Sequence, residues 1–265
     1  MLADVHRAFA ARRRGTRLVV LSDFDGTLAE FDLDPTLPRI RSDALAALVA
    51  LSSLPHVTLG LVSGRRVADL ARRVSLGSEV YMAGLHGLEI AAGARLWQHA
   101  AIATARPVVQ RLSRLLVGVV DRIAGARLED KGPSVAVHVR GVAPEARAGV
   151  LHAADRAAEP WLGDGTLRRL VGAEVHEYLP GTHWTKGDAV RWIVHDVERH
   201  TGQPAWVAYF GDDLTDEDAF RAIDEGVSVV VGRRASVARF RLASTADVAA
   251  VLARVADAAA AEGRP

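Results

Sequence analysis

The sequence contains no cysteine among its 265 residues, which excludes disulfide bonds, thiolate nucleophiles and thiolate metal ligands. A chain without cysteine fits a reducing compartment, and we expect a cytoplasmic location. Met1–Gly15 lacks the apolar segment of a signal peptide, so no secretion signal is predicted. No stretch approaches the roughly 18 uncharged apolar residues that a membrane-spanning helix needs.

The chain also lacks an excess of charge of one sign, because its formal net charge is only +1. No overall field would attract it to nucleic acid or to a membrane surface, and basic residues are not interleaved with aromatic ones. Arg12–Arg14 is the only compact basic run, and a solvated helix face explains it best. A hydrophobic content of 49% with 25% charged residues is typical of a globular protein, which we expect to be a monomer.

Lysine is scarce as well, since only Lys131 and Lys186 are lysines among the 33 Lys and Arg residues. The sequence uses arginine wherever a general surface cation would serve. The two lysines can therefore mark places that need a compact ammonium group, where a planar guanidinium would not fit. With only two residues, chance is the alternative.

Strand-like and helical segments alternate at both ends of the chain, which predicts an α/β fold with a Rossmann-like, doubly wound parallel sheet. A further pattern favours a helix start at Thr185, because Thr185 and Asp188 are spaced as a capping pair. The expected strands are Leu18–Asp23, Val57–Val62, Val80–Ala83, Ala205–Phe210 and Val227–Val231. The expected helices are Leu2–Arg14, Ser42–Leu54, Arg65–Val74, Lys186–His200, Asp216–Ile223 and Thr245–Ala261.

The middle of the chain has a different pattern and is predicted to be an inserted α+β domain, 105–182. Pro107 can begin a long helix that ends near Gly125. Ser134–Arg140 alternates valines with polar residues, as in an antiparallel strand with one covered face. A second helix and two strands complete the insert, at Pro144–Glu159, Thr166–Val171 and Glu174–Tyr178. The core domain would then comprise 1–104 and 183–265.

The segment Asp23-Phe24-Asp25-Gly26-Thr27 follows the first expected strand and places two carboxylates at its end. Strand side chains alternate, so Asp23 and Asp25 can share a direction while Phe24 packs inside. Two close carboxylates repel each other unless a cation, a shared proton or hydrogen bonds compensate them. An ordinary strand-to-turn exit rich in Asp and Gly is the alternative.

Further polar groups follow other expected strands, at the sheet edge where doubly wound folds bind ligands. Ser63 lies where a helix is expected to begin, and Lys186 begins another helix. Carboxylates suit a hard divalent cation, and a hydroxyl at a helix start suits a phosphate group, although Ser63 alone could simply cap the helix. The remaining members of this set are Asp212, Asp213 and Asp216.

These residues, in this order, resemble the four motifs of the haloacid dehalogenase superfamily of phosphatases. The resemblance implies that Asp23 is a nucleophile that forms an aspartyl-phosphate, and that Asp25 is the general acid and base. It implies a Mg²⁺ ion held by Asp23, the backbone carbonyl of Asp25 and Asp212. Ser63, with Gly64 and Arg65 beside it, and Lys186 would bind the phosphoryl group. Asp216 and Asp213 would orient Lys186 or metal-bound water.

Within that superfamily the chain is similar to the trehalose-6-phosphate phosphatases, on the segments Ala83–Gly87, Glu129–Ser134, His138-x-Arg140 and Gly211–Glu217. The insert then resembles a cap domain that selects the sugar. Its candidate substrate-binding residues are Glu129, Lys131, Ser134, His138, Arg140 and Glu177. For each of them a solvated surface is the alternative, and His138 and Arg140 could instead brace the cap internally.

Four positions depart from the polar residues usual in that family: Ala173, Val175, Leu179 and Thr185. A site that hydrogen-bonds a hydroxyl group discriminates strongly, whereas an apolar one does not. The expected activity is therefore Mg²⁺-dependent hydrolysis of trehalose 6-phosphate, with a related glycosyl or pseudodisaccharide phosphate as the alternative substrate. A phosphosugar mutase and a silent regulatory module are further alternatives.

Overall fold

The computed structural model describes residues 2–30, 38–172 and 174–262. The chain packs into two compact units, a core unit of residues 1–97 and 184–265 and an inserted unit of residues 98–183. Sequence analysis drew the boundaries at 105 and 182. That the insert is a substrate-selecting cap stays a prediction.

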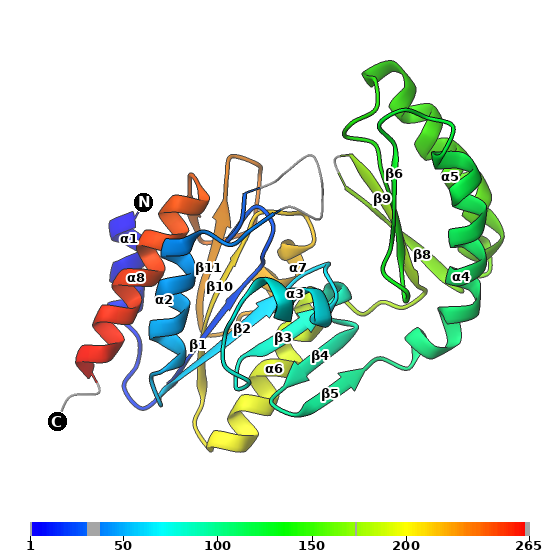
Figure 1. Cartoon of the computed structure of the whole chain (residues 1–265). Helices are drawn as coiled ribbons and strands as arrows, with labels where there is room; N and C mark the ends of the chain where they lie inside the picture. The colour runs from blue at the N-terminus through cyan, green and yellow to red at the C-terminus, as the bar shows by residue number, and fades with distance from the viewer. Residues whose placement is uncertain (1, 31–37, 173, 263–265) are drawn as a thin grey trace. The chain divides into compact units, whose positions relative to one another are not determined.

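The core unit is built on an eight-stranded sheet in the order β12-β11-β10-β1-β2-β3-β4-β5 (Figure 1). Pairing is parallel from β12 through β3, and β4 runs antiparallel to β3. The strands are β1 (Arg17–Ser22), β2 (Val57–Val62), β3 (Tyr81–Gly84), β4 (Glu89–Ala92), β5 (Arg95–Gln98), β10 (Ala205–Gly211), β11 (Gly226–Val231) and β12 (Phe240–Leu242).

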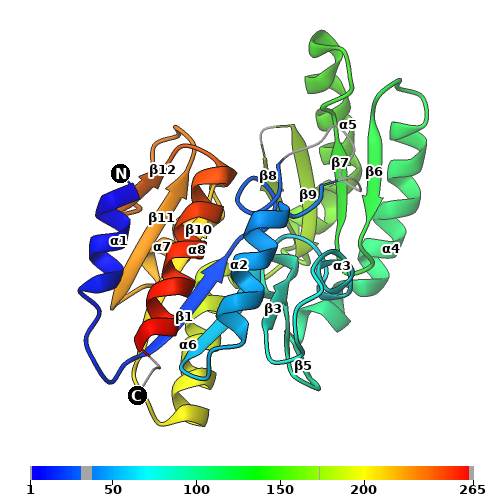
Figure 2. The same cartoon turned by 60° about the vertical axis from the view of Figure 1, so that its left-hand side comes forward.

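Both faces of this sheet are covered. The apolar residues of β1 show this, because they alternate between two hydrophobic clusters, one on each face. Leu18 and Val20 pack with α1 (Leu2–Ala10), α2 (Ser42–Ser52), α3 (Val67–Arg73) and α8 (Thr245–Glu262). Val19 and Leu21 pack with α6 (Lys186–Thr201) and α7 (Asp216–Arg221) on the other face (Figure 2). A strand buried on both faces reads as one continuous apolar run. The predicted doubly wound α/β fold is confirmed.

Several element boundaries differ from the prediction. Helix α1 ends at Ala10 rather than Arg14, because Arg12 instead donates to the Thr16 carbonyl and pairs with Glu262 on α8. Helix α3 begins at Val67 rather than Arg65. Sequence analysis also missed β4, β5 and β12, which are only three or four residues long and give too short a pattern to recognise.

The inserted unit has a four-stranded antiparallel sheet in the order β6-β7-β9-β8, with α4 (Ala101–Val120) and α5 (Pro144–Gly163) packed on it. Val135, Val137 and Val139 join the helices in one cluster, as the alternation predicted. The strands are β6 (Arg127–Asp130), β7 (Val135–His138), β8 (Leu167–Val171) and β9 (Val175–Pro180), of which sequence analysis missed β6.

Pro107 does not begin the first helix of the insert, because α4 starts six residues earlier and contains Pro107 in its interior. Buried Ala105 continues the apolar stripe of Val109, Leu112 and Leu116 toward the N-terminus. This packing offsets the backbone hydrogen bond that a proline inside a helix removes.

Across the described ranges, no helix is both long and apolar enough to span a bilayer.

A buried carboxylate joins the β3–β5 end of the core sheet to α6. Asp196 accepts hydrogen bonds from the Tyr81 hydroxyl at 2.8 Å, from Arg95 Nη2 at 2.7 Å and from Arg199 Nη2 at 3.0 Å. Burial raises the pKa of Asp196, but these donors outweigh burial and lower the pKa to about 2. The ionised form therefore stabilises the folded core.

We expect Asp196→Asn to lower the free energy of unfolding by about 2 kcal/mol at pH 7, because a pKa shift of nearly two units has that value. The folded-state pKa lies below the usual 3.8, so this stabilisation is complete above about pH 4 and is lost as pH falls toward 2. Urea unfolding of both proteins across this range measures the effect. A difference that stays constant from pH 7 to pH 3 would contradict the assignment.

Candidate active site

The first predicted motif lies directly after β1. The Asp23 backbone N–H donates to the Phe210 carbonyl at 2.8 Å, which continues the β1–β10 pairing by one residue. Gly26 has φ +77°, and a Cβ there would lie 2.2 Å from an Asp212 carboxylate oxygen. Glycine is therefore required, because it lets the turn after β1 approach the loop after β10. Asp23 and Asp212, 189 positions apart in sequence numbering, meet at this edge.

Lys186 connects two of the carboxylates. Its Nζ lies 3.0 Å from Asp23 Oδ1 and 2.8 Å from Asp216 Oδ1, and the side chain is only 2% exposed. The predicted capping pair positions it, because Thr185 and Asp188 form a capping box at the start of α6. Burial lowers the pKa of Lys186, but the Asp216 and Asp23 carboxylates outweigh burial and raise it. The ammonium group stays charged in this site.

Asp216 is fully buried and is held by three donors. Besides Lys186, the Tyr209 hydroxyl donates to Oδ1 at 2.7 Å and the Asp213 backbone N–H donates to Oδ2 at 2.9 Å. A Cβ on Gly211 would lie 2.3 Å from the Asp216 carboxyl carbon, so the loop closes this tightly only with glycine. Asp213 itself is exposed. These contacts fit the prediction that Asp216 orients Lys186.

Three carboxylates crowd together in this site. Asp23, Asp212 and Asp216 each offer an oxygen within 4.8 Å of the others, and the Thr27 hydroxyl donates to Asp212 at 3.0 Å. Burial and the neighbouring carboxylates raise the pKa of Asp23 well above its usual value, although Lys186 opposes them. Burial, followed by the charge of Asp216, raises the pKa of Asp212 to about 7. Oxygen donors that repel one another in this way fit a hard divalent cation.

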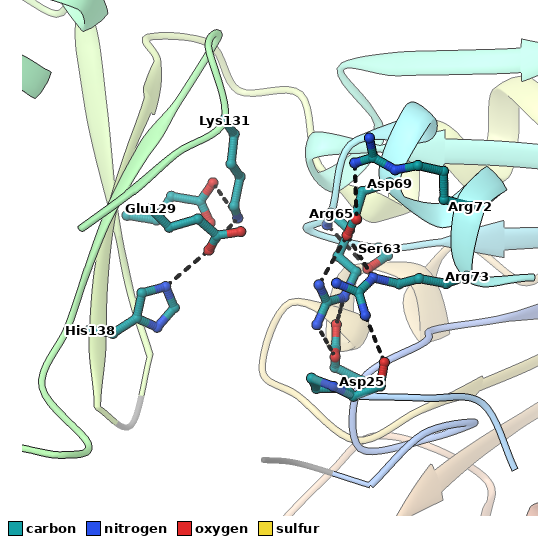
Figure 3. A network of polar contacts seen from close by, with 11 residues as sticks. Asp25, Ser63, Arg65, Asp69, Arg72, Arg73, Glu129, Lys131 and His138 are labelled. Carbon is teal, nitrogen blue, oxygen red and sulfur yellow. Dashed lines mark hydrogen bonds and ion pairs between the residues drawn. The ribbon is translucent and has the colours of Figure 1, made fainter. Parts of the chain in front are cut away.

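Asp25 lies in a second polar network, which Figure 3 shows beside the Ser63 side chain. Arg65 Nε and Nη2 donate to the two Asp25 oxygens, each at 2.7 Å, and Arg65 Nη1 donates to Asp69 at 3.0 Å. Asp69 also accepts from Arg73 Nε at 2.8 Å. The Arg65 guanidinium lies over the Phe24 ring, 5.6 Å from its centroid. Arg65, predicted to bind the phosphoryl group, is thus held in place against Asp25.

Ser63 is buried at the end of β2, but it does not cap a helix, because α3 begins four residues later. Its Oγ accepts from the Arg65 backbone N–H at 3.2 Å, and its carbonyl accepts from the His86 N–H at 2.9 Å. His86 also lies against Gly64, where a Cβ would be 2.7 Å from the imidazole ring. The Ser63 hydroxyl can still donate its proton, as a phosphoryl contact requires.

In the inserted unit, five of the six candidate sugar-binding residues gather on the sheet face opposite the helices. Glu177 Oε1 accepts from Lys131 Nζ at 3.0 Å and from Ser134 Oγ at 2.7 Å. The Glu129 carboxylate lies 2.9 Å from His138 Nε2 (Figure 3). Burial raises the pKa of Glu129, but His138 and Lys131 outweigh burial and lower it. The Glu129 carboxylate is therefore kept ionised, 3.9 Å from the Lys131 ammonium group.

Arg140, the sixth candidate, pairs elsewhere. Its Nε donates to Glu174 at 2.6 Å, and Glu174 also accepts from Arg147 on α5. These contacts favour the alternative in which Arg140 braces the insert. Of the four positions that depart from the family pattern, Val175 pairs with His138 across the sheet and Thr185 caps α6. Leu179 is buried in β9, and Ala173 lies outside the described residues.

Sequence analysis missed several residues that support the site. Tyr209 lies in an apolar strand, so nothing in the local pattern separated it from ordinary packing residues. Thr27 was named only as part of the segment after the first strand, because its partner Asp212 is distant in sequence, and Asp69 was not singled out although it bridges Arg65 and Arg73. Arg234 was not singled out among the 33 basic residues, although it contacts the Asp212 and Asp213 carbonyls.

Comparison with solved structures identifies the fold. The C-terminal domain of a Candida albicans trehalose-6-phosphate phosphatase superposes with a TM-score of 0.83 over 97% of each chain, at 20% identity. A C. albicans trehalose synthase regulatory protein domain gives 0.72 at 13% identity, covering 94% of this chain and 97% of that one. A haloacid dehalogenase-like hydrolase from Bacteroides thetaiotaomicron gives 0.64 at 16% identity, covering 91% and 99%.

Curated relatives are closer in sequence. The trehalose-phosphate phosphatase of Mycobacterium marinum is 38% identical over 247 residues, which are 91% of this chain and 62% of that protein. The M. tuberculosis H37Rv enzyme of the same name is 36% identical over 244 residues, 89% of this chain and 61% of the relative. This chain thus spans about three fifths of their length. A family model described as trehalose-phosphatase matches residues 21–246, from the end of β1 to the start of α8, and the chain therefore belongs to the trehalose-phosphatase family.

Proposed function

We propose that the chain hydrolyses trehalose 6-phosphate to trehalose and phosphate, with Asp23 as the nucleophile. The buried group of Asp23, Lys186 and Asp216 carries this proposal. In this group the Asp23 carboxylate lies beside the Lys186 ammonium, at the edge of the sheet where ligands bind in doubly wound folds. The match to the trehalose-phosphatase family and the names of the curated relatives support the substrate.

In the first step, an Asp23 oxygen attacks phosphorus and the bond from phosphorus to the sugar oxygen breaks. Lys186 fixes the Asp23 carboxylate through its 3.0 Å contact and stabilises charge on the phosphoryl oxygens. Ser63 donates its hydroxyl proton to one of those oxygens. Mg²⁺, held by Asp23 and Asp212, would supply positive charge that lets an anionic nucleophile approach an anionic ester.

Asp25 transfers the protons in both steps. It protonates the departing sugar oxygen, and it then removes a proton from the water that attacks phosphorus and releases Asp23. Both Asp25 oxygens accept from Arg65, so proton delivery requires at least one of these hydrogen bonds to be exchanged for the substrate. Arg65, anchored on Asp69, returns Asp25 to the same position after each transfer.

A phosphate-release assay with Mg²⁺ over trehalose 6-phosphate, glucose 6-phosphate and sucrose 6-phosphate tests this proposal. We expect a strong preference for trehalose 6-phosphate. Release that depends on an added sugar bisphosphate would favour a mutase. No release from any ester would favour a silent regulatory module. The fold alone does not exclude this alternative, because the domain of a trehalose synthase regulatory protein has the same fold. Preference for another ester would favour a related glycosyl phosphate, an alternative that Val175, opposite His138, keeps open.

The polar face of the insert is proposed to bind the sugar. We expect Lys131→Met to raise KM for trehalose 6-phosphate about tenfold with little change in kcat, because a hydrogen bond from a charged donor to a remote hydroxyl binds substrate and transition state alike. Steady-state kinetics measure both constants. Arg114→Met is the control, since Arg114 is exposed on α4, which packs on the opposite face of the sheet. Equal KM values for wild type and Lys131→Met would reject this role.

A further inference from the structure

Arg234, just after β11, contacts the backbone of the loop that carries the acidic residues. Its Nε donates to the Asp212 carbonyl at 2.5 Å, and its Nη2 donates to the Asp213 carbonyl at 2.6 Å. Its Nη1 contacts Glu217 in the first turn of α7. The Arg234 side chain is 23% exposed, and its contacts with the Asp212 carbonyl and Glu217 are partly buried. One planar fork thus spans the loop from Asp212 to the start of α7.

The Glu217 carboxylate, on α7, anchors the Arg234 guanidinium. One of its oxygens accepts from Arg234, and the other accepts from the Val237 backbone N–H at 2.9 Å. The Glu217 side chain is 11% exposed. The segment 234–237 is therefore attached to α7 at two points, which fixes the guanidinium against the Asp212 and Asp213 carbonyls.

Asp212 depends on such support more than its neighbours do. Asp23 and Asp216 are each held by Lys186, whereas the hydrogen bond described at the Asp212 carboxylate comes from the Thr27 hydroxyl. The position of the Asp212 carboxylate therefore depends mainly on how the backbone of its loop is held.

We propose that Arg234 is a positioning residue for the divalent cation, because it fixes the backbone from which Asp212 reaches the cation. The proposal rests on the cation of the proposed function. Arg234 donates to carbonyl oxygens and not to the Asp212 carboxylate, so it fixes the ligand without competing with the cation for it. Removal of a residue that orients a metal ligand typically weakens metal binding about 10- to 100-fold.

Binding of Mn²⁺ to the metal-free protein, measured by electron paramagnetic resonance, tests this role without any turnover. We expect Arg234→Met to weaken Mn²⁺ binding about 10- to 100-fold and Arg234→Lys to weaken it less, because lysine can keep one carbonyl contact. Arg239→Met is the matched control. Arg239 also donates to a backbone carbonyl, that of Gly226 at 3.0 Å, but at the start of β11, away from the acidic loop.

If Arg234→Met does not fold, Arg234→Lys and Glu217→Gln carry the test, and both should bind Mn²⁺ several-fold more weakly than wild type. Unchanged Mn²⁺ affinity in the folded variants, with wild type binding normally, would overturn the role of Arg234 alone. A purely structural role would lower the melting temperature and leave this affinity unchanged. If wild type binds no Mn²⁺, the cation of the proposed function fails first, and the role of Arg234 fails with it.

Discussion

Asp23→Asn is expected to remove turnover and leave the fold intact. Asparagine keeps the shape of the side chain but cannot form the covalent bond to phosphorus, and uncatalysed phosphate ester hydrolysis is extremely slow. We expect kcat for phosphate release to fall by at least about 10⁴-fold, as for other enzymes that lose a nucleophile. Retention of more than about a few per cent of the rate would reject Asp23 as the nucleophile.

The stability of this variant should not fall, which separates a chemical role from a structural one. Burial and neighbouring carboxylates raise the pKa of Asp23, so its ionised form is costly to keep in the folded protein. Asparagine removes that charge, while Lys186 keeps its 2.8 Å contact with Asp216. We expect the free energy of unfolding, measured in urea, to stay the same or rise.

Asp257→Asn is the control for this variant, because Asp257 is exposed on α8 and should change neither rate nor stability. Beryllium fluoride gives a second measurement. It mimics an aspartyl-phosphate, so it should inhibit the wild type only if a carboxylate is esterified during turnover. Inhibition of phosphate release that is absent with beryllium or fluoride alone supports the covalent intermediate, and full resistance to beryllium fluoride contradicts it.

The parts of the site that could be predicted are those that short sequence patterns encode. The apolar run before Asp23 predicted a buried strand, and the capping pair at Thr185 predicted where α6 begins and thus where Lys186 lies. Parallel strands bring such ends to one edge, so Asp23 and Asp212 could be brought together without coordinates.

The contacts that could not be predicted depend on tertiary packing. The resemblance assigned Arg65 to the phosphoryl group, which stays a prediction, but no sequence pattern indicated that its guanidinium contacts both Asp25 and Asp69. Arg140 belongs to an alternating strand pattern that suggested a polar binding face. Its partner Glu174 lies 34 residues away, and no local signal indicated that pairing.

Lys186→Met is expected to lose both activity and stability, in contrast to Asp23→Asn. The ammonium is the cation that contacts Asp23 and fully buried Asp216, so its removal leaves uncompensated buried carboxylates. Breaking a buried ion pair by removing one partner costs about 3–5 kcal/mol, and we expect a loss of that size in urea unfolding. The rate should fall by at least about 10³-fold, because a fixed positive charge no longer faces the phosphoryl group.

Two further variants separate charge from shape. Lys186→Arg keeps the positive charge, so it should recover part of the lost stability. It should not recover the rate, because a planar fork does not fit a site in which the lysine side chain is 2% exposed. The double variant Lys186→Met with Asp216→Asn removes both charges of the 2.8 Å pair and should be more stable than Lys186→Met alone. If the double variant is no more stable than Lys186→Met, Lys186 does not compensate the charge of Asp216. Full activity in Lys186→Arg would show that the site does not require a compact cation.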